Sequence, residues 1–178
     1  MKKITTTTPE ETKQIARDFA RQLHPGDLVL LTGDLGAGKT TFVQGIAEGL
    51  GASTPATSPS FVIVNEYPLG GMGHGAWATG KQYGEPSPKP QHPSPIVLRH
   101  IDLYRLPVPR AESMGDPTID LDRIGLPELL SDPDAITAVE WADRLPLELA
   151  STLREVVTIT MAHGEQEGER SMTIEGGR

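Results

Sequence analysis

The strongest constraint on this chain is an apolar run that leads directly into a glycine-rich turn. Residues 27–33, DLVLLTG, are almost continuously apolar, which is typical of a strand buried on both faces. The segment Gly33–Thr40 reads GDLGAGKT and matches the pattern G-x-x-x-x-G-K-[ST]. Apolar residues at helical spacing then continue to Leu50 and predict a helix that ends at Gly51. A strand, a glycine-rich loop and a helix in this order predict a phosphate-binding unit.

The loop has the chemistry that holds a phosphate group. Its glycines let the backbone wrap so that successive N–H groups point inward, and the start of the helix adds a partial positive charge. Lys39 places a positive charge on the β- and γ-phosphates, and the Thr40 hydroxyl is a ligand for Mg²⁺. The alternative is an ordinary glycine-rich turn with a chance lysine. The flanking strand and helix favour the nucleotide site.

The remaining patterns predict one α/β domain over residues 1–178. A helix is expected after Thr8, with Pro9 at its first position and Glu11 completing a capping box. A short helix is expected within 121–130. Strands are expected at 3–8, 60–67, 94–104 and 135–141, with a closing β-hairpin formed by 155–162 and 170–176.

We therefore expect a three-layer fold like that of the P-loop nucleoside triphosphatases. Its central sheet is mostly parallel, with antiparallel edge strands and a C-terminal β-hairpin. A segment rich in glycine and proline at about 68–95 has little from which to build a core, and it is interpreted as a flexible insertion. A second irregular stretch is expected at 107–120.

Composition excludes several classes of function. The chain contains no cysteine, so thiolate nucleophiles, zinc–thiolate sites and disulfides are excluded. A formal net charge of -8 argues against binding RNA unaided, since phosphate neutralisation needs a basic face. No secretory signal and no membrane-length apolar run is present, so a cytoplasmic protein without membrane contact is expected.

Two carboxylates are candidates for the metal site. Asp102 and Glu140 each end an apolar run, and the ends of parallel strands gather at the edge of a sheet where ligands bind. Either could reach Mg²⁺ directly or through a water molecule. The alternative for each is to cap a turn or to pair with Arg99 or Arg105. The guanine-reading pattern N-K-x-D is absent, which favours ATP as the nucleotide.

Four motifs in one order resemble those of the TsaE (formerly YjeE) family, small bacterial ATPases that help make threonylcarbamoyladenosine in tRNA. They are GDLGAGKTTF (33–42), SPSFVIVNEY (58–67), HIDLYRL (100–106) and AVEW (138–141). The resemblance covers most of the chain. It implies that the phosphate loop spans Gly33–Thr41, so the residues expected to contact the nucleotide are Gly33, Asp34, Gly36, Ala37, Gly38, Lys39, Thr40 and Thr41.

The resemblance also implies roles outside the loop. Glu140 is the expected second metal ligand after Thr40, and Asp102 is needed for activity. Ser58-Pro59-Ser60 corresponds to a switch-like segment, and Asp102 or Ser60 is expected to orient the attacking water. Glu11 corresponds to an acidic position near the nucleotide. Ser60 stands where a threonine is usual, and the 68–95 insertion replaces a short turn.

The function that the resemblance implies is a Mg²⁺-dependent ATPase, weak alone, that drives the cycle of the partner proteins TsaB and TsaD. tRNA is then contacted only through the complex. Two other functions remain open, a P-loop small-molecule kinase and a nucleotide-gated binding module. Asp34, an acidic residue within the phosphate loop, either faces outward toward a partner or water, or closes a local turn. Tyr104 and Trp141 contact a partner, pack on the nucleotide or belong to the core.

Overall fold

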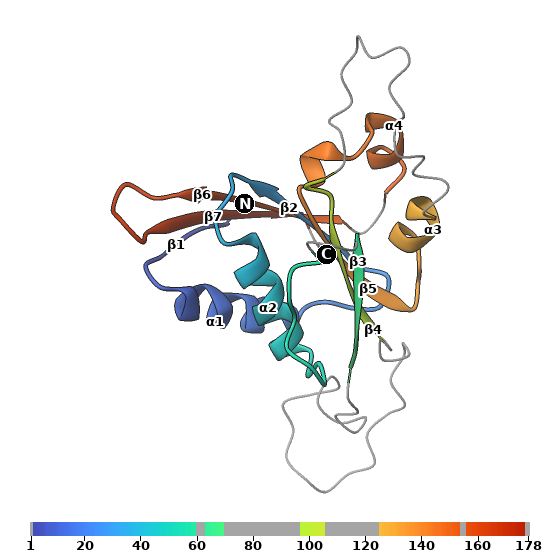
Figure 1. Ribbon diagram of the computed structural model, residues 1–178, viewed down its shortest axis with the longest axis horizontal. Helices are drawn as coiled ribbons and strands as arrows, with labels where there is room; N and C mark the ends of the chain where they lie inside the picture. The colour runs from blue at the N-terminus through green and yellow to red at the C-terminus, as the bar shows by residue number, and fades with distance from the viewer. Residues whose placement is uncertain (1, 60–62, 70–96, 106–124, 154–155, 177–178) are drawn as a thin grey trace, which may run out of the picture.

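The computed structural model describes residues 2–59, 63–69, 97–105, 125–153 and 156–176 (Figure 1). The predicted insertion at 68–95 lies outside the described residues from position 70 onward, as does the irregular stretch at 107–120. Ser60, one of the predicted catalytic residues, also lies outside them.

The described strands form one sheet of seven, in the order β1-β7-β6-β2-β5-β4-β3. β2 pairs in parallel with β5 and β6, and β5 pairs in parallel with β4, whereas the strands beyond this centre are antiparallel. The predicted fold class is therefore confirmed, including the closing hairpin. The strands are β1 (Lys2–Thr6), β2 (Leu28–Gly33), β3 (Val64–Pro68), β4 (Val97–Asp102), β5 (Ala135–Glu140), β6 (Val156–His163) and β7 (Arg170–Gly176).

Helices lie on both sides of this sheet. α1 (Pro9–Ala20) and α2 (Lys39–Gly49) pack together on one side, and α3 (Leu126–Leu130) and α4 (Leu147–Ala150) lie toward the other (Figure 1). Two separate clusters of buried apolar side chains follow this division. The short α4 and the 3₁₀ turn η1 (Ala142–Arg144) were not predicted from the sequence.

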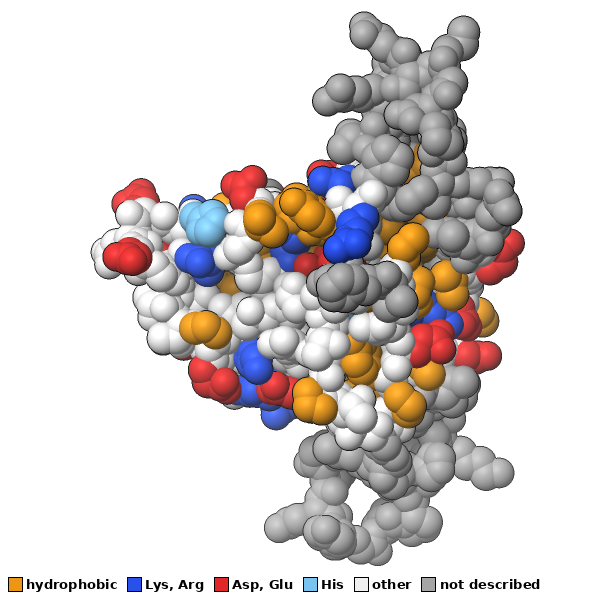
Figure 2. Space-filling view, in the orientation of Figure 1, with side chains coloured by type: hydrophobic (Ala, Val, Ile, Leu, Met, Phe, Trp, Pro, Cys, Tyr) orange, Lys and Arg blue, Asp and Glu red, His pale blue; other side chains and the backbone are white. Residues whose placement is uncertain are grey.

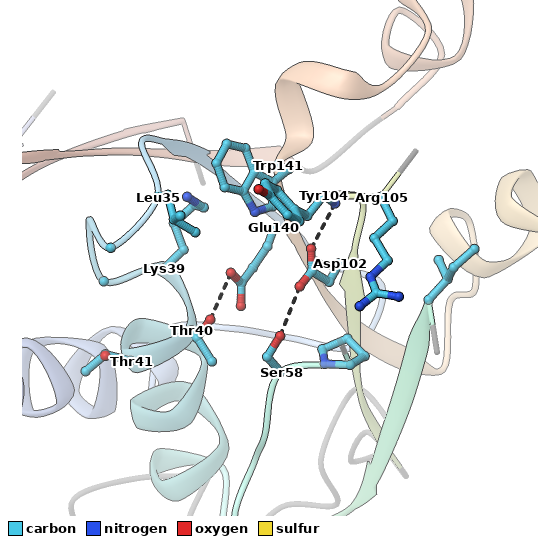
Figure 3. A pocket seen from close by; sticks show the side chains of 14 residues that line it. Leu35, Lys39, Thr40, Thr41, Ser58, Asp102, Tyr104, Arg105, Glu140 and Trp141 are labelled. Carbon is cyan, nitrogen blue, oxygen red and sulfur yellow. Dashed lines mark hydrogen bonds between the residues drawn. The ribbon is translucent and has the colours of Figure 1, made fainter. Parts of the chain in front are cut away.

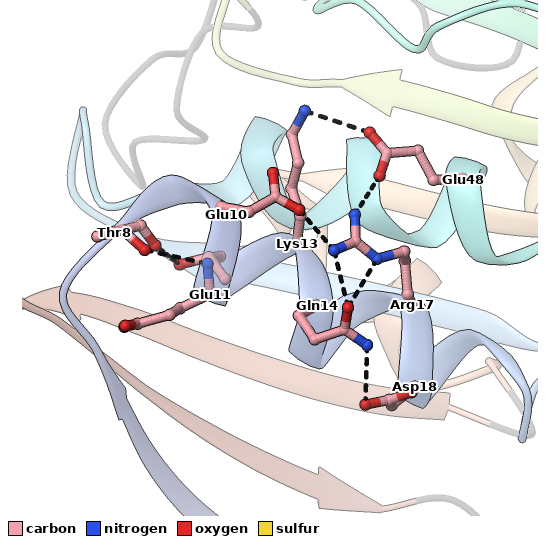
Figure 4. Close-up of polar contacts among 9 residues, drawn as sticks. Thr8, Glu10, Glu11, Lys13, Gln14, Arg17, Asp18 and Glu48 are labelled. Carbon is pink, nitrogen blue, oxygen red and sulfur yellow. Dashed lines mark hydrogen bonds and ion pairs between the residues drawn. The ribbon is translucent and has the colours of Figure 1, made fainter.

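The start of α1 follows the predicted pattern with one difference. Thr8 is the N-cap, and its hydroxyl accepts a hydrogen bond from the backbone N–H of Glu11 (Figure 4). The Glu11 carboxylate accepts from the backbone N–H of Thr7 at 2.7 Å, one residue before the position that a capping box requires. This backbone N–H and the Thr7 hydroxyl lower the pKa of Glu11.

Small residues allow α1 and α2 to approach closely. A Cβ atom added at Gly45 would lie 2.6 Å from both the Ala16 Cβ and the Lys13 carbonyl oxygen. Lys13 and Arg17 of α1 both reach Glu48 of α2, at 3.2 and 2.5 Å (Figure 4). Glycine therefore sets the distance between the helices, and the ion pairs cross the exposed side of their contact.

Arg99 on β4 connects β3, α3 and the segment that follows α3. Its guanidinium contacts Glu66 of β3 at 2.7 Å and Asp132 at 3.0 Å, and it donates to the Leu129 carbonyl at 2.9 Å. The side chain of Arg99 is only 7% exposed. The alternative pairing of Arg99 with Asp102 or Glu140 does not occur among these contacts. The other alternative, a carboxylate that caps a turn, holds for Asp102, which accepts from the backbone N–H of Tyr104.

The replacement Gly45→Ala tests the helix contact. Its methyl group would collide with α1 backbone, so we expect the free energy of unfolding to fall by about 1–3 kcal/mol. Urea denaturation measures the change, with Gln44→Ala on the same helix as the control. Equal stability of Gly45→Ala and the wild type would contradict the close approach.

The replacement Asp132→Asn tests the Arg99 cluster through pH. The backbone N–H of Asp134 and the guanidinium of Arg99 lower the pKa of Asp132 from its ordinary value of 3.8. The stabilisation is then complete above that value and is lost as pH falls through the lowered pKa. We expect the variant to be less stable by roughly 1 kcal/mol at pH 7 and equal to wild type in strong acid. A pH series of urea melts, with Asp18→Asn as control, measures this; a difference that persists in strong acid would contradict it.

Candidate functional site

The candidate site is a pocket of about 450 Å³ at the carboxyl ends of the parallel strands β2, β4 and β5 (Figure 3). The segment that precedes β3 and the start of α2 complete its walls. The residues that line it are Leu35, Gly36, Gly38, Lys39, Thr40, Thr41, Ser58, Pro59, Ile63, Asp102, Tyr104, Arg105, Glu140 and Trp141. Distant motifs of the sequence therefore meet at one place.

The shape of the phosphate loop depends on its glycines. Gly33, Gly36 and Gly38 have φ angles of 125°, 77° and 102°, in the region that favours glycine. At Gly33 a side chain is also excluded by space, because a Cβ atom would lie 1.9 Å from the Met161 carbonyl oxygen. The loop therefore needs glycine both for its backbone angles and for its closeness to β6.

Asp34 closes the turn of this loop with its backbone. Its carbonyl accepts from the N–H of Ala37 at 3.2 Å, while its side chain is exposed and does not line the pocket. The side chain of Ala37 is fully buried. Asp34 and Ala37 thus shape the loop without presenting their side chains to the pocket.

Lys39 lies at the centre of the site and folds back on its own loop. Its Nζ donates to the carbonyls of Gly33 at 2.6 Å and Asp34 at 2.8 Å, and it lies 3.7 Å from the centroid of the Trp141 ring. Only 4% of Lys39 is exposed. Burial lowers the pKa of Lys39, and the negative charge of Glu140 opposes this effect. Lys39 is thus a buried cation beside the loop that is predicted to bind phosphate.

The two predicted carboxylates lie on neighbouring strands at the same level, because Asp102 and Glu140 are register partners in β4 and β5. Glu140 accepts from the Thr40 hydroxyl at 3.0 Å and is only 2% exposed. Asp102 accepts from the Ser58 hydroxyl at 3.0 Å and from the backbone N–H of Tyr104 at 2.9 Å (Figure 3). The structure therefore brings Thr40, Asp102 and Glu140 together as predicted.

These oxygen atoms suit Mg²⁺, which prefers oxygen ligands and usually takes one or two carboxylates together with substrate phosphates. Within the described residues, no group of three or more His, Cys, Asp or Glu side chains could hold a metal by itself. The hydroxyl of Thr40 and the carboxylates of Asp102 and Glu140 are the residues that would hold the ion together with a phosphate.

His100 contacts Glu140 of the site without lining the pocket, and it was not predicted from the sequence. It is fully buried, and its Nε2 lies 2.8 Å from the Glu140 carboxylate. Its Nδ1 is buried and has no hydrogen-bond partner among the described residues. Because an ionised carboxylate can only accept, Nε2 is the hydrogen-bond donor in this contact with Glu140. The sequence offered one indication that His100 lies near the site. His100 and Asp102 are two residues apart on one strand, and such residues share a face of the sheet.

Aromatic side chains form one wall of the pocket. Trp141 follows Glu140 with a φ angle of 59°, which a non-glycine residue rarely adopts, and this turns the chain sharply at the end of β5. Its ring lies 4.9 Å from that of Tyr104. Arg144 lies over both rings and donates to the Tyr104 carbonyl. Trp141 is partly buried and packs on the apolar cluster that includes Leu103 and Leu145, so it has the predicted core role, and it also lines the pocket.

The structure does not bring every predicted residue to the pocket. The Glu11 carboxylate is used in the cap of α1, and Glu11 does not line the pocket. Of the switch-like segment, Ser58 and Pro59 line the pocket.

No helix in the described parts of the chain is long and apolar enough to cross a membrane.

Comparison with known proteins gives one family. A sequence profile described as "Threonylcarbamoyl adenosine biosynthesis protein TsaE" matches residues 6–172. The TsaE protein of Bacillus subtilis is 36% identical over 173 residues, which cover 97% of this chain and 85% of the relative. That of Streptomyces coelicolor is 34% identical, over 92% of this chain and 89% of the relative. A crystal structure of Bacillus subtilis YdiB superimposes with a TM-score of 0.62 at 28% identity, covering 99% of this chain and 86% of that one.

The replacement His100→Ala tests the contact beneath Glu140. The buried carboxylate would lose a donor, so we expect the free energy of unfolding to fall by roughly 1–3 kcal/mol. Urea denaturation of the ligand-free protein measures this, with His24→Ala as a control at a partly exposed histidine. A variant as stable as the wild type would show that His100 does not hold Glu140.

Proposed function

This chain belongs to the TsaE family of tRNA threonylcarbamoyladenosine biosynthesis proteins, and we propose that within that process it is a Mg²⁺-dependent ATPase. The observation that supports ATP hydrolysis is the convergence in one pocket of the phosphate loop, Lys39, Thr40 and two carboxylates. Phosphoryl transfer needs mainly positioning and charge stabilisation, which these groups supply.

The first role of these residues is binding. A triphosphate seated on the loop would replace the Gly33 and Asp34 carbonyls as the acceptors for Lys39. A buried ammonium group gains from this exchange, because charged phosphate oxygens are stronger acceptors than carbonyls. When bound, Mg²⁺ neutralises charge on the phosphates.

The second role is to position the attacking water. Asp102 is the carboxylate for this role, because it lines the pocket. The hydrogen bonds that it accepts from Ser58 and Tyr104 fix its orientation. Glu140, which is buried against His100, is better suited to hold the metal with Thr40. This division of roles between the two carboxylates is part of the proposal.

We place TsaB and TsaD as the partners of this ATPase on the basis of the family resemblance. A partner that binds at the rim of the pocket would cover Leu35 and Tyr104, which are 70% and 46% exposed. Figure 2 shows exposed hydrophobic side chains on one face of the molecule, beside Lys and Arg side chains. Hydrolysis is then expected to be slow in the isolated protein and faster in the complex.

Steady-state ATP hydrolysis tests the proposed function, measured for the protein alone and with TsaB, TsaD and tRNA. We expect partners to raise turnover. Lys39→Ala and Glu140→Gln are each expected to lower kcat/KM by roughly 100-fold or more. The first removes a positive charge from the phosphates, and the second removes the negative charge that would hold Mg²⁺ with Thr40. Lys3→Ala, at an exposed lysine of β1, is the control.

The other outcomes separate the alternative functions. ATP binding without turnover, even in the presence of the partners, would contradict the ATPase and favour a nucleotide-gated module. Turnover that the partners do not change would contradict the proposed coupling and favour a kinase, for which acceptor hydroxyl compounds would then be screened.

A further inference from the structure

The C-terminal hairpin extends past the end of β2 and runs beside the phosphate loop. The last register pair between these strands joins Gly33 to Met161, whereas β6 continues to His163. The same register places Leu35 beside His163, and the His163 Nε2 lies 3.1 Å from the Leu35 carbonyl oxygen. β6 thus contacts the loop where β2 has already ended.

Arg170 makes a second contact of the same kind. It is the cross-strand partner of His163 in the β6–β7 pair. Its Nε donates to the Gly36 carbonyl at 3.0 Å, and its Nη1 donates to the Glu169 carbonyl at 2.8 Å. Two neighbouring side chains of the hairpin therefore hold two consecutive carbonyls of the phosphate loop.

These contacts fix two peptide planes. Because a trans peptide group is planar, a carbonyl held on one side directs the following N–H to the other side. The Leu35 carbonyl is held by the hairpin, so the Gly36 N–H faces away from His163. The Gly36 carbonyl is held too, and the following N–H, that of Ala37, closes the turn on Asp34. The tip of the loop is thus fixed from outside the pocket.

The hairpin does not need these side chains for its own structure. Backbone ladders join β6 to β2 and β7, and β7 to β1. The loop depends more on outside support, because its glycines lose more backbone freedom than other residues when they are ordered. A group that orders the loop before the ligand arrives strengthens binding by reducing this cost.

We propose that His163 and Arg170 are positioning residues that hold the phosphate loop ready for the nucleotide. The hairpin, which lies outside the four motifs shared with the family, would then determine the affinity for the phosphate groups. This inference rests on the proposed function, because it assumes that the loop binds ATP and ADP.

The test is binding of ADP with Mg²⁺ to the full chain, measured by calorimetry. His163→Leu and Arg170→Met are each expected to weaken binding by about tenfold, which corresponds to roughly 1.4 kcal/mol, because ADP binding must then order a loop that the hairpin no longer holds. His163→Gln keeps an N–H donor and is expected to bind within about threefold of wild type. Arg21→Met and His24→Leu are matched controls at exposed positions away from the loop.

Two further readouts separate positioning from a general loss of structure. The melting temperature of His163→Leu and Arg170→Met is expected to stay at the wild-type value. In the ligand-free variants, the amide resonances of Gly36 and Ala37 are expected to shift in ¹H–¹⁵N spectra, because the carbonyls that precede them lose their donors.

Unchanged ADP affinity in His163→Leu and Arg170→Met would overturn this inference alone. Failure of His163→Gln to restore affinity, or a parallel loss of thermal stability, would overturn it as well. If the wild type binds no ADP, the proposed function fails and the inference fails with it. Binding of ADP by the wild type therefore separates failure of this inference from failure of the proposed function.

Discussion

The parallel pairing of β2 with β5 and β6 is the constraint on which the rest of the site depends. It places Leu31 beside Glu140 on one side and Gly33 beside Met161 on the other. Since side chains alternate along a strand, a slip of one residue would move Glu140 to the opposite face of the sheet. The carboxylate would then point away from Thr40, and the loop would lose the close contact with β6 that only Gly33 permits.

The site combines one buried cation with two carboxylates. Lys39 is the buried cation, and the carboxylates of Asp102 and Glu140 lie on adjacent strands across the pocket. A triphosphate alone would bring further negative charge toward these carboxylates. On the proposed function, a divalent cation held by Glu140 and Thr40 would reduce this repulsion, and metal binding would then favour nucleotide binding.

Sequence reasoning predicted the parts of this protein that depend on local pattern. The strand before Gly33, the loop with Lys39 and Thr40, the cap at Thr8 and the closing hairpin each carry their signal in a short window. It was less successful where distant residues meet. Nothing in the sequence around His100 indicates its contact with Glu140, which lies on another strand. In the same way, the contact of His163 with the Leu35 carbonyl follows only from the position of β6 beside the loop. Short turns such as η1 and α4 have too few residues to show a period.

The sheet order has a consequence for how this protein is made. Among the described strands β1 comes first in the sequence and β7 comes last, and the two are neighbours in the sheet. The phosphate loop is likewise translated early, whereas the strand that packs against Gly33 comes near the end. A nascent chain therefore carries the complete nucleotide motif long before it can assemble the sheet around it. Because contacts between residues so far apart in sequence close slowly, the phosphate loop gains its packing against β6 only after β6 has been translated.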